Sequence, residues 1–244
     1  MKQRLDKYLF AQGLVASRSQ AESYIRLGKA MVNGRVVTKP GAMVGPDDTV
    51  KLRAEEQYVS RAGLKLASVA QTLDIDFRGK TVLDVGSSTG GFTDFALRRG
   101  AAKVVAVDVG TEQLHPSLRG DERIELHEKT DIRDYVTAWQ QSREPKFNIV
   151  VMDVSFVSLR EILPSVAWVC SDRTVVAAML KPQFEAGKQQ VNKGVIKNDS
   201  VRRQILKDFE QWVQSLFVVM DKADSDVAGA KGNRERFYLL KRSK

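Results

Sequence analysis

The chain of 244 residues is long enough for one domain of about 150–200 residues and a smaller module beside it. Its formal net charge of +9 favours an anionic partner, and the lack of any apolar run of about 18 residues excludes a transmembrane helix. The amino terminus lacks the apolar core of a signal peptide, and the single cysteine, Cys170, can form no internal disulfide, so we expect a reduced, cytoplasmic protein without a membrane partner.

Residues 1–58 predict a small module of two short helices followed by short strands. An apolar stripe indicates a first helix that ends at Gly13, and a capping box that begins at Ser17 indicates a second helix. Two β-prone runs on either side of Asn33-Gly34 predict a hairpin, and residues 49–52 predict a further strand. We therefore expect an α+β module here and a larger domain over residues 59–244.

This module is strongly basic, since residues 1–39 hold eight Lys or Arg and two acids, a balance of +6. Such a cluster can be a merely solvated face, but its density on so small a module favours contact with RNA. Three runs resemble the S4 domain, a family of small RNA-binding modules: Arg4-Leu5-Asp6-Lys7-Tyr8-Leu9, Ser17-Arg18-Ser19-Gln20-Ala21 and Val32-Asn33-Gly34. The residues that we expect to contact RNA are Arg4, Lys7, Arg18, Arg26, Lys29 and Arg35.

A short apolar strand leads into a glycine-rich turn and then a helix over residues 81–93, whose sequence is TVLDVGSSTGGFT. This arrangement brings bare backbone N–H groups and a helix N-terminus against a ligand. A second apolar strand ends at Asp108, 22 residues after Gly86, where a carboxylate can accept both hydroxyls of a ribose. Together the two features predict an adenosine-cofactor site on a doubly wound sheet.

The same turn discriminates among cofactors. A P-loop is excluded because Phe92 stands where a lysine is needed, and a nicotinamide dinucleotide fits less well because the turn lacks a middle glycine for the pyrophosphate. S-adenosylmethionine (SAM) has no pyrophosphate, so this looser turn suffices for it. The residues that we expect to bind SAM are Asp84, Gly86, Ser88, Thr89, Gly90, Gly91, Phe92 and Asp108.

Strand-like and helix-like segments alternate through the larger domain, which predicts a parallel, doubly wound α/β sheet. The last two predicted strands follow one another without a helix between them, so they should form an antiparallel terminal hairpin. A parallel sheet that ends in one reversed hairpin is the seven-stranded arrangement typical of SAM-dependent methyltransferases. The predicted strands cover residues 81–86, 103–109, 123–127, 147–154, 174–180, 216–221 and 235–241.

Four charged residues stand at predicted strand ends or near the start of the larger domain: Lys65, Asp153, Lys181 and Glu235. The carboxyl ends of parallel strands line the ligand crevice in such sheets. Any one of these charges can simply face solvent where a strand ends. Two basic and two acidic residues on converging ends instead favour a catalytic cluster.

The residues after Asp153 narrow the choice of methyl acceptor. Enzymes that methylate exocyclic base nitrogens share a proline-containing segment here, whereas this chain continues Val154-Ser155-Phe156. Methylation of pyrimidine carbon 5 needs a cysteine nucleophile, and Cys170 lies away from every predicted strand end. A ribose hydroxyl remains, and a lysine can accept its proton where a second cation and partial desolvation favour the neutral amine.

The charged set resembles the Lys-Asp-Lys-Glu tetrad of the RrmJ/FtsJ-type 2′-O-ribose methyltransferases. Further matching motifs are Ser60-Arg61-Ala62-Gly63-x-Lys65-Leu66, Lys181-Pro182-Gln183-Phe184-Glu185 and Gly232-Asn233-x-Glu235. With the basic module they make nearly the whole chain similar to the TlyA family, often labelled hemolysin A. The resemblance implies a SAM-dependent cytidine 2′-O-methyltransferase that acts on ribosomal RNA or ribosomal subunits. It also places Asp131 against the adenine, although an ordinary helix N-cap explains Asp131 nearly as well.

Other functions stay open at this stage. The chain can be an RNA-binding protein with a SAM-binding domain that has lost catalysis, or a membrane-lytic hemolysin. The predicted helix near residues 198–216 has a core-facing stripe of ordinary width, which disfavours the second alternative. Pseudouridine synthesis shares the S4-like module but needs no SAM site. His115 and His127 stand in no metal-ligand spacing, so we expect no required metal.

Overall fold

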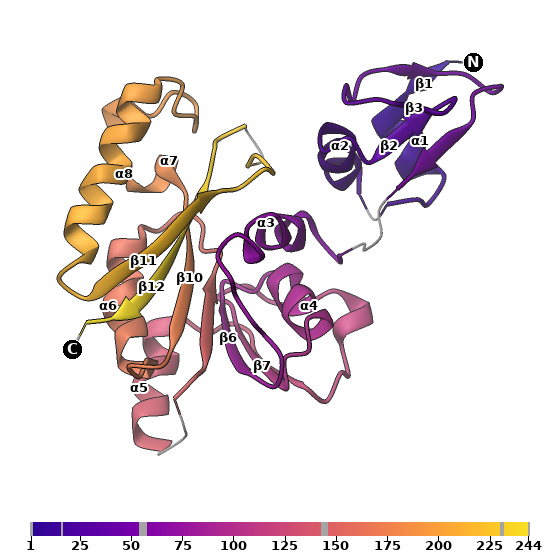
Figure 1. Ribbon diagram of the computed structural model, residues 1–244. Coiled ribbons are helices and arrows are strands. Elements are labelled where there is room, and N and C mark those ends of the chain that lie inside the picture. Colours follow the sequence, from indigo (N-terminus) through magenta and orange to yellow (C-terminus); the bar gives the residue numbers. More distant parts are fainter. Residues whose placement is uncertain (1, 16, 54–57, 143–145, 230–231, 244) are drawn as a thin grey trace.

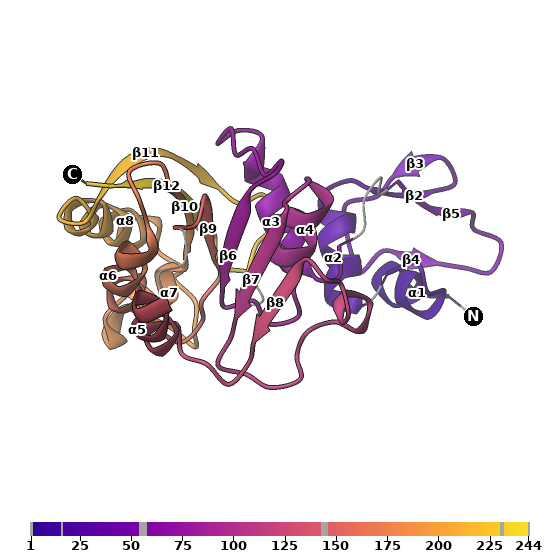
Figure 2. The same cartoon turned by 90° about the horizontal axis from the view of Figure 1, so that it is seen from below.

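The chain folds into a small amino-terminal module and a larger α/β domain (Figure 1). The computed structural model describes residues 2–15, 17–53, 58–142, 146–229 and 232–243. Seen from below, the module projects from the side of the larger domain that carries α3 and α4, with α2 nearest to that domain (Figure 2).

The module contains the two predicted helices, α1 (Leu5–Ala11) and α2 (Arg18–Arg26). The Ser17 side chain accepts a hydrogen bond from the Gln20 backbone N–H and so caps α2, as the capping box predicts. Asn33 and Gly34 both have positive φ, the conformation that a tight two-residue hairpin turn requires.

The strands of the module form two small sheets. The predicted hairpin and third strand pair in the order β3-β2-β5, whereas the two-residue strands β1 and β4 were not predicted because so short a run carries no pattern. Their bounds are β1 (Gln3–Arg4), β2 (Ala30–Val32), β3 (Arg35–Val36), β4 (Met43–Val44) and β5 (Val50–Leu52).

The larger domain contains the predicted seven-stranded sheet, in the order β11-β12-β10-β9-β6-β7-β8. The first five strands along the chain are parallel, and β12 runs antiparallel to both β10 and β11, which confirms the terminal hairpin. The strands are β6 (Thr81–Val85), β7 (Lys103–Val107), β8 (Ile124–His127), β9 (Ile149–Met152), β10 (Val175–Leu180), β11 (Phe217–Asp224) and β12 (Arg236–Arg242).

Helices cover both faces of this sheet (Figure 2). Alternate strand residues face opposite ways, so Val82 packs in the core under α3 and α4, and its neighbour Leu83 packs under α5, α6 and α8. The helical elements are α3 (Arg61–Ala70), α4 (Gly91–Arg98), α5 (Ile132–Ser142), α6 (Leu159–Val169), α7 (Pro182–Glu185), α8 (Asp199–Val213) and the 3₁₀ turns η1 (Pro116–Leu118) and η2 (Lys188–Gln190).

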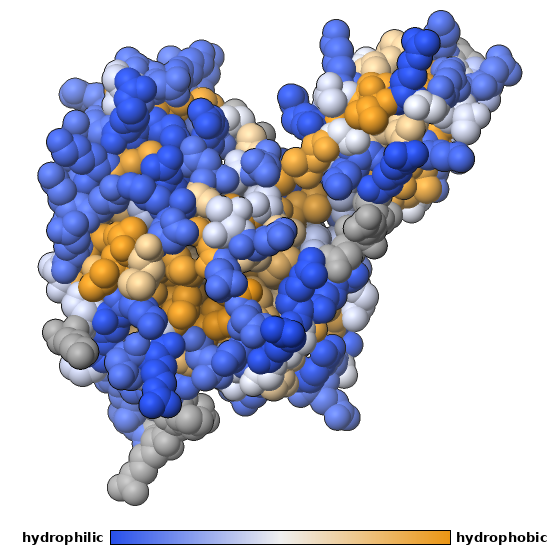
Figure 3. Space-filling model, viewed as in Figure 1, coloured by the Kyte–Doolittle hydropathy of each residue, from blue (hydrophilic) through white to orange (hydrophobic). Residues whose placement is uncertain are grey.

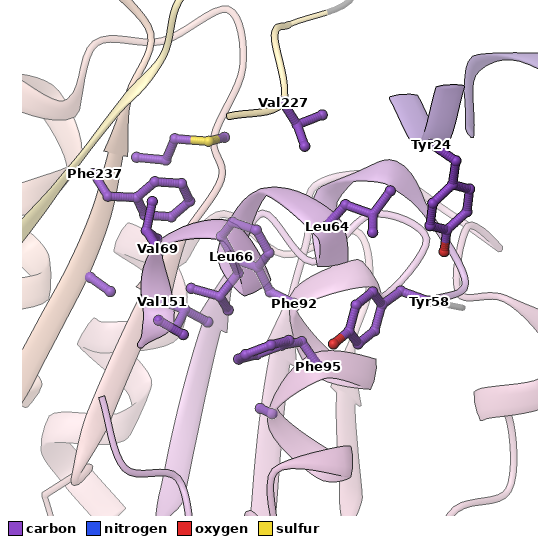
Figure 4. Close-up of a cluster of buried hydrophobic side chains, with 14 of the residues drawn as sticks. Tyr24, Tyr58, Leu64, Leu66, Val69, Phe92, Phe95, Val151, Val227 and Phe237 are labelled. Atoms are coloured by element: carbon purple, nitrogen blue, oxygen red, sulfur yellow. The ribbon is translucent and has the colours of Figure 1, made fainter. Parts of the chain in front are cut away.

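One hydrophobic core continues from the sheet into the amino-terminal module. Figure 4 shows Phe92 between the sheet and α3, and Tyr58 lying between Phe95 and Tyr24 of α2. A buried hydrogen bond of 2.6 Å runs from Gln20 Nε2 to the Tyr58 carbonyl, and the next N–H along the chain, that of Val59, donates to Asp94 of α4 at 2.8 Å. The module is therefore packed against the larger domain through α2.

The far end of the sheet is less covered. Figure 3 shows apolar side chains gathered over β11 and β12, where Val218 and Met220 are exposed. None of the described helices has the length and apolar composition needed to cross a membrane.

Candidate active site

Two adjacent cavities open at the carboxyl ends of β6, β7 and β9. The larger measures about 530 Å³ and the smaller about 140 Å³, and Gly86, Ser88, Asp153 and Ser155 line both. The sheet extends from β6 to β7 and β8 on one side and to β9 and β10 on the other, so the strand order reverses at β6. Open α/β sheets bind ligands at the point where the strand order reverses.

The glycine-rich turn forms the wall between these cavities. Gly86 has a φ of +79°, and a Cβ on it would lie 3.0 Å from the Asp153 carbonyl, so only glycine lets the ends of β6 and β9 approach so closely. Asp108 fixes the other side of the turn: its Oδ2 accepts from the Ser88 N–H at 2.8 Å and its Oδ1 from the Gly110 N–H at 2.6 Å. The Asp108 carboxylate also lines the larger cavity, as a ribose acceptor must.

The remaining residues of the turn divide into two groups. Thr89 and Phe92 line the smaller cavity. Gly90 and Gly91 line neither cavity. A Cβ on Gly90 would lie 2.6 Å from Leu118 Cδ1, and a Cβ on Gly91 would lie 2.8 Å from the Gly63 nitrogen. These two glycines therefore allow α4 to pack closely against η1 and α3, a packing role that the glycine pattern alone did not distinguish from ligand contact.

Asp84 supplies the clearest sign of a ligand. Its side chain is fully buried, and its Oδ2 accepts a 2.7 Å hydrogen bond from Thr93 Oγ1. Its Oδ1 has no hydrogen-bond partner among the described residues, although Asp84 lines the smaller cavity. Burial, partly offset by the Thr93 hydrogen bond, raises the pKa of Asp84 to about 7. An orphaned buried carboxylate oxygen fits a cationic or hydrogen-bond-donating group of a cofactor.

Asp131 lines the larger cavity and also lies at the start of α5. It accepts from the Arg133 backbone N–H at 2.9 Å, as a helix-capping residue does. The Arg133 guanidinium binds both carboxylate oxygens, at 2.8 and 2.6 Å, and lowers the pKa of Asp131. Both interpretations of this residue are therefore compatible with its position.

The four charged residues form two ion pairs at one edge of the sheet. Lys181 Nζ lies 2.6 Å from Asp153 Oδ1, and it donates a hydrogen bond of 2.6 Å to Ser155 Oγ. Lys65 Nζ lies 2.5 Å from Glu235 Oε2, with both side chains nearly buried. Lys181 and Asp153 line the smaller cavity, whereas Lys65 and Glu235 line neither.

The strand register explains why these pairs are neighbours. Leu180, the last residue of β10, pairs with Arg236, the first residue of β12. The antiparallel register, continued by one residue, sets Lys181 opposite Glu235. Lys65 reaches the same edge from α3, which packs beside β12 through Phe237 and Val69 (Figure 4).

Sequence reasoning missed several residues of the cavity wall. Gly110 holds Asp108, and Gln113 Oε1 accepts a 2.8 Å hydrogen bond from Ser88 Oγ. Phe156 lines the larger cavity, is 92% exposed and has a φ of +66°. Loop residues such as Gln113 follow no periodic pattern, so their place at the site depends on the three-dimensional fold.

The basic residues predicted in the module, from Arg4 to Arg35, are all exposed. Two of them are anchored by Asp6, which is fully buried: Arg4 Nε donates to its Oδ1 at 2.9 Å and Arg18 donates to its Oδ2 at 3.0 Å. The Arg4 guanidinium is the main cause that lowers the pKa of Asp6 to about 2. Asp6 therefore holds two guanidinium groups side by side on the surface of the module.

Two other sequence expectations concern nucleophiles and metals. Burial raises the pKa of the Cys170 thiol to about 12, and its Sγ donates to the Val166 carbonyl, so this cysteine is unsuited to nucleophilic chemistry. In the described part of the chain, no group of three or more His, Cys, Asp or Glu side chains is arranged to hold a metal ion.

Comparison with known proteins identifies the class that this fold and site define. Residues 58–242 match the FtsJ-like methyltransferase family, and residues 3–50 match the S4 domain. The chain thus belongs to the FtsJ-like methyltransferases and, by its near full-length relatives, to the TlyA group that also carries an S4 domain. It is a methyltransferase, and SAM is its cofactor.

The relatives are similar along nearly their whole length. The chain is 37% identical to the 16S/23S rRNA (cytidine-2′-O)-methyltransferase TlyA of Mycobacterium tuberculosis, covering 98% of this chain and 89% of that protein. It is 36% identical to Hemolysin A of Brachyspira hyodysenteriae, covering 95% and 97%. A solved structure described as a "putative hemolysin from Streptococcus thermophilus" aligns with a TM-score of 0.74 at 35% identity, covering 100% of this chain and 89% of that chain.

Proposed function

We propose that this protein transfers a methyl group from SAM to the 2′-hydroxyl of a cytidine in ribosomal RNA. In this proposal residues 1–58 bind the RNA, and residues 59–244 hold the cofactor and the Lys65, Asp153, Lys181 and Glu235 cluster. The single observation that most directly supports this reaction is the Lys181–Asp153 pair on the wall of the smaller cavity. The name of the Mycobacterium tuberculosis relative supports the choice of cytidine and of ribosomal RNA.

The two cavities fit the parts of SAM. Asp108, which follows β7, can accept the ribose hydroxyls, and Asp131 lines the same cavity and can face the adenine. The orphaned Asp84 oxygen suits the cationic amino group. When bound, SAM supplies a methyl group on a positively charged sulfur, which makes that carbon open to attack by an oxygen nucleophile.

Lys181 is the group best placed to act on the ribose hydroxyl. Its Nζ has three hydrogen-bonding directions, and Asp153 and Ser155 take two of them at 2.6 Å each. In the described residues no hydrogen bond occupies the third direction, which can orient the substrate hydroxyl, and the neutral amine can accept its proton. Because methyl transfer needs oxygen, carbon and sulfur nearly in line, holding Lys181 from two sides contributes to the rate through positioning.

The proposal is tested by incubating the protein and SAM labelled in its methyl group with each purified ribosomal subunit. We expect label in RNA at one or a few cytidines, resistant to alkaline cleavage at the modified position because the 2′-hydroxyl is blocked. Label on a base, or no label in either subunit, contradicts the proposal. Dye-loaded liposomes incubated with the protein in parallel test whether it lyses membranes, as the name of the Brachyspira relative suggests. We expect no leakage of the dye.

A further inference from the structure

The short helix α7 contacts the loop of residues 153–158 along its length. Lys181, which precedes α7, binds Asp153 and Ser155 at the start of this loop. The rings of Phe184 and Phe156 lie with their centroids 5.3 Å apart in the middle. The last residue of α7, Glu185, binds the far end, so the two segments are joined at three points.

The contacts of Glu185 are specific. Its Oε2 accepts a hydrogen bond of 2.6 Å from Ser158 Oγ, and its Oε1 accepts one of 2.7 Å from the Leu159 N–H at the start of α6. Its side chain is 1% exposed, and it forms an ion pair with the Arg160 guanidinium, whose Nε lies 3.7 Å from Oε2. Burial raises the pKa of Glu185, with the two hydrogen bonds acting against this shift.

A carboxylate in such a place is costly for the fold. Removing a carboxylate from water destabilises the folded state even where two hydrogen bonds and a cation at 3.7 Å offset part of that cost, whereas a neutral side chain can cap a helix without it. The loop that Glu185 holds is itself strained, because Phe156 combines a bulky side chain with a φ of +66°. Strain of this kind persists only where the surrounding contacts enforce it, and it concentrates at functional sites.

We propose that Glu185 is a positioning residue for methyl transfer, which anchors the far end of loop 153–158 so that Asp153 and Ser155 keep hold of Lys181. This inference rests on the proposed function, since it concerns the same site. Glu185 touches neither cavity, and it acts only through the loop. Lys181 is therefore held in two ways. The end of β10 holds its backbone, and loop 153–158, which Glu185 of α7 anchors, holds its side chain.

The test compares Glu185→Ala with Glu185→Gln. Alanine removes both hydrogen bonds, whereas glutamine keeps an oxygen for the Leu159 N–H and an amide for Ser158 Oγ, which can accept. The matched control is Glu161→Ala, which removes an exposed carboxylate from the first turn of α6, the helix whose first residue Glu185 binds. For each variant we would measure SAM affinity by calorimetry, the single-turnover rate at saturating SAM and RNA, and amide hydrogen exchange of peptides that cover residues 153–160.

We expect Glu185→Ala to bind SAM within about threefold of the parent, yet to transfer methyl about 10- to 100-fold more slowly, the scale of a small misplacement at an active site. Hydrogen exchange should accelerate over residues 153–160 and stay unchanged in β6 and β10. Glutamine should restore most of the rate, and Glu161→Ala should match the parent.

Three results would overturn the inference: unchanged hydrogen exchange of the loop in Glu185→Ala, a parental single-turnover rate in that variant, or a Glu185→Gln protein as slow as the alanine variant. Failure of the proposed function is distinguishable, because the unaltered protein would then transfer no methyl group to RNA. The exchange measurement tests the anchoring in that case too, because it does not depend on turnover.

Discussion

Lys181 and Asp153 follow the ends of two neighbouring parallel strands, and their side chains meet at 2.6 Å. In the β9–β10 register Ala178 pairs with Met152, so β10 extends two residues farther before Lys181. Pro182 then ends the strand, since it has no N–H to continue the ladder. This difference in length lets the lysine side chain reach back to the carboxylate.

The first prediction concerns the turn after β6. Gly90→Ala should lower the free energy of unfolding by about 1–2 kcal/mol because the residue has a φ of +86°, which side chains with a Cβ adopt at a cost. The new methyl group would also meet Leu114 and Leu118, so the turn should shift and SAM affinity should fall. Chemical denaturation and calorimetry measure the two effects.

Gly34→Ala provides the matched control for this prediction. Gly34 has a similar φ of +78°, but nothing lies within 4 Å of its added Cβ, and it is in the module rather than at the cavities. We expect this variant to lose stability without losing SAM affinity. Equal losses of SAM affinity in both variants would show that Gly90 has no particular role in shaping the turn.

The second prediction is a pH dependence of cofactor binding. With a pKa of about 7, Asp84 is mostly protonated in the free protein at pH 5, whereas a cationic amino group binds the ionised carboxylate. SAM affinity should therefore rise as pH increases from about 5 toward 7, by up to about tenfold per unit, and then level off. Titration calorimetry at several pH values measures it.

Asp84→Asn should remove this dependence while leaving the Thr93 hydrogen bond in place, because the asparagine oxygen can accept it. The variant should bind SAM more weakly than the parent at pH 7. If the variant and the parent show the same pH profile, Asp84 is not the group that titrates on binding, and our assignment of its free oxygen to the amino group is wrong.

The third prediction concerns RNA binding by the module. Lys7, Lys29 and Arg35 are exposed, and replacing all three by Glu should weaken RNA binding. It should also reduce the slope of log K against log salt by up to about three units, given roughly 0.7–0.9 per phosphate contact. SAM affinity should be nearly unchanged, since the cavities lie in the other domain. A salt slope equal to the parent's would mean that these charges are only solvated.

Arg4 and Arg18 are less suitable for that test because of Asp6. Reversing either charge would set a new carboxylate beside a buried one and destabilise the module. Since the pKa of Asp6 is depressed to about 2, its pairing with Arg4 stabilises the fold above the ordinary pKa of an Asp and is lost as pH falls toward 2. A loss of RNA binding in these two variants would therefore not distinguish a destabilised module from the loss of contacts with RNA.

Much of the architecture could be predicted from local patterns. Apolar runs that end at Asp108 and Asp153 locate strands of the sheet, and the absence of a helix between the last two strands predicts the reversed hairpin. Asn33-Gly34 specifies its turn because few other residues adopt that backbone conformation. These features depend on short stretches of chain, so they can be predicted from the sequence alone.

The arrangement of the site could be predicted only in part. The pattern indicates that Lys65, Asp153, Lys181 and Glu235 converge, but not that they pair as Lys181 with Asp153 and Lys65 with Glu235. Nor does it distinguish Gly86, which lines the cavities, from Gly90, which packs against leucines. Pairing and packing depend on strand register and on the placement of α3, which join segments far apart in the chain.

The central claim, that the Lys181–Asp153 pair performs ribose methylation, is tested most directly by Lys181→Ala and Lys181→Arg on a confirmed RNA substrate. We expect both to bind SAM and RNA nearly as the parent does, yet to lose single-turnover methyl transfer by at least about 100-fold, the scale of an acid–base group. Arginine should not rescue, because its guanidinium stays protonated. Near-parental transfer by either folded variant would contradict the account.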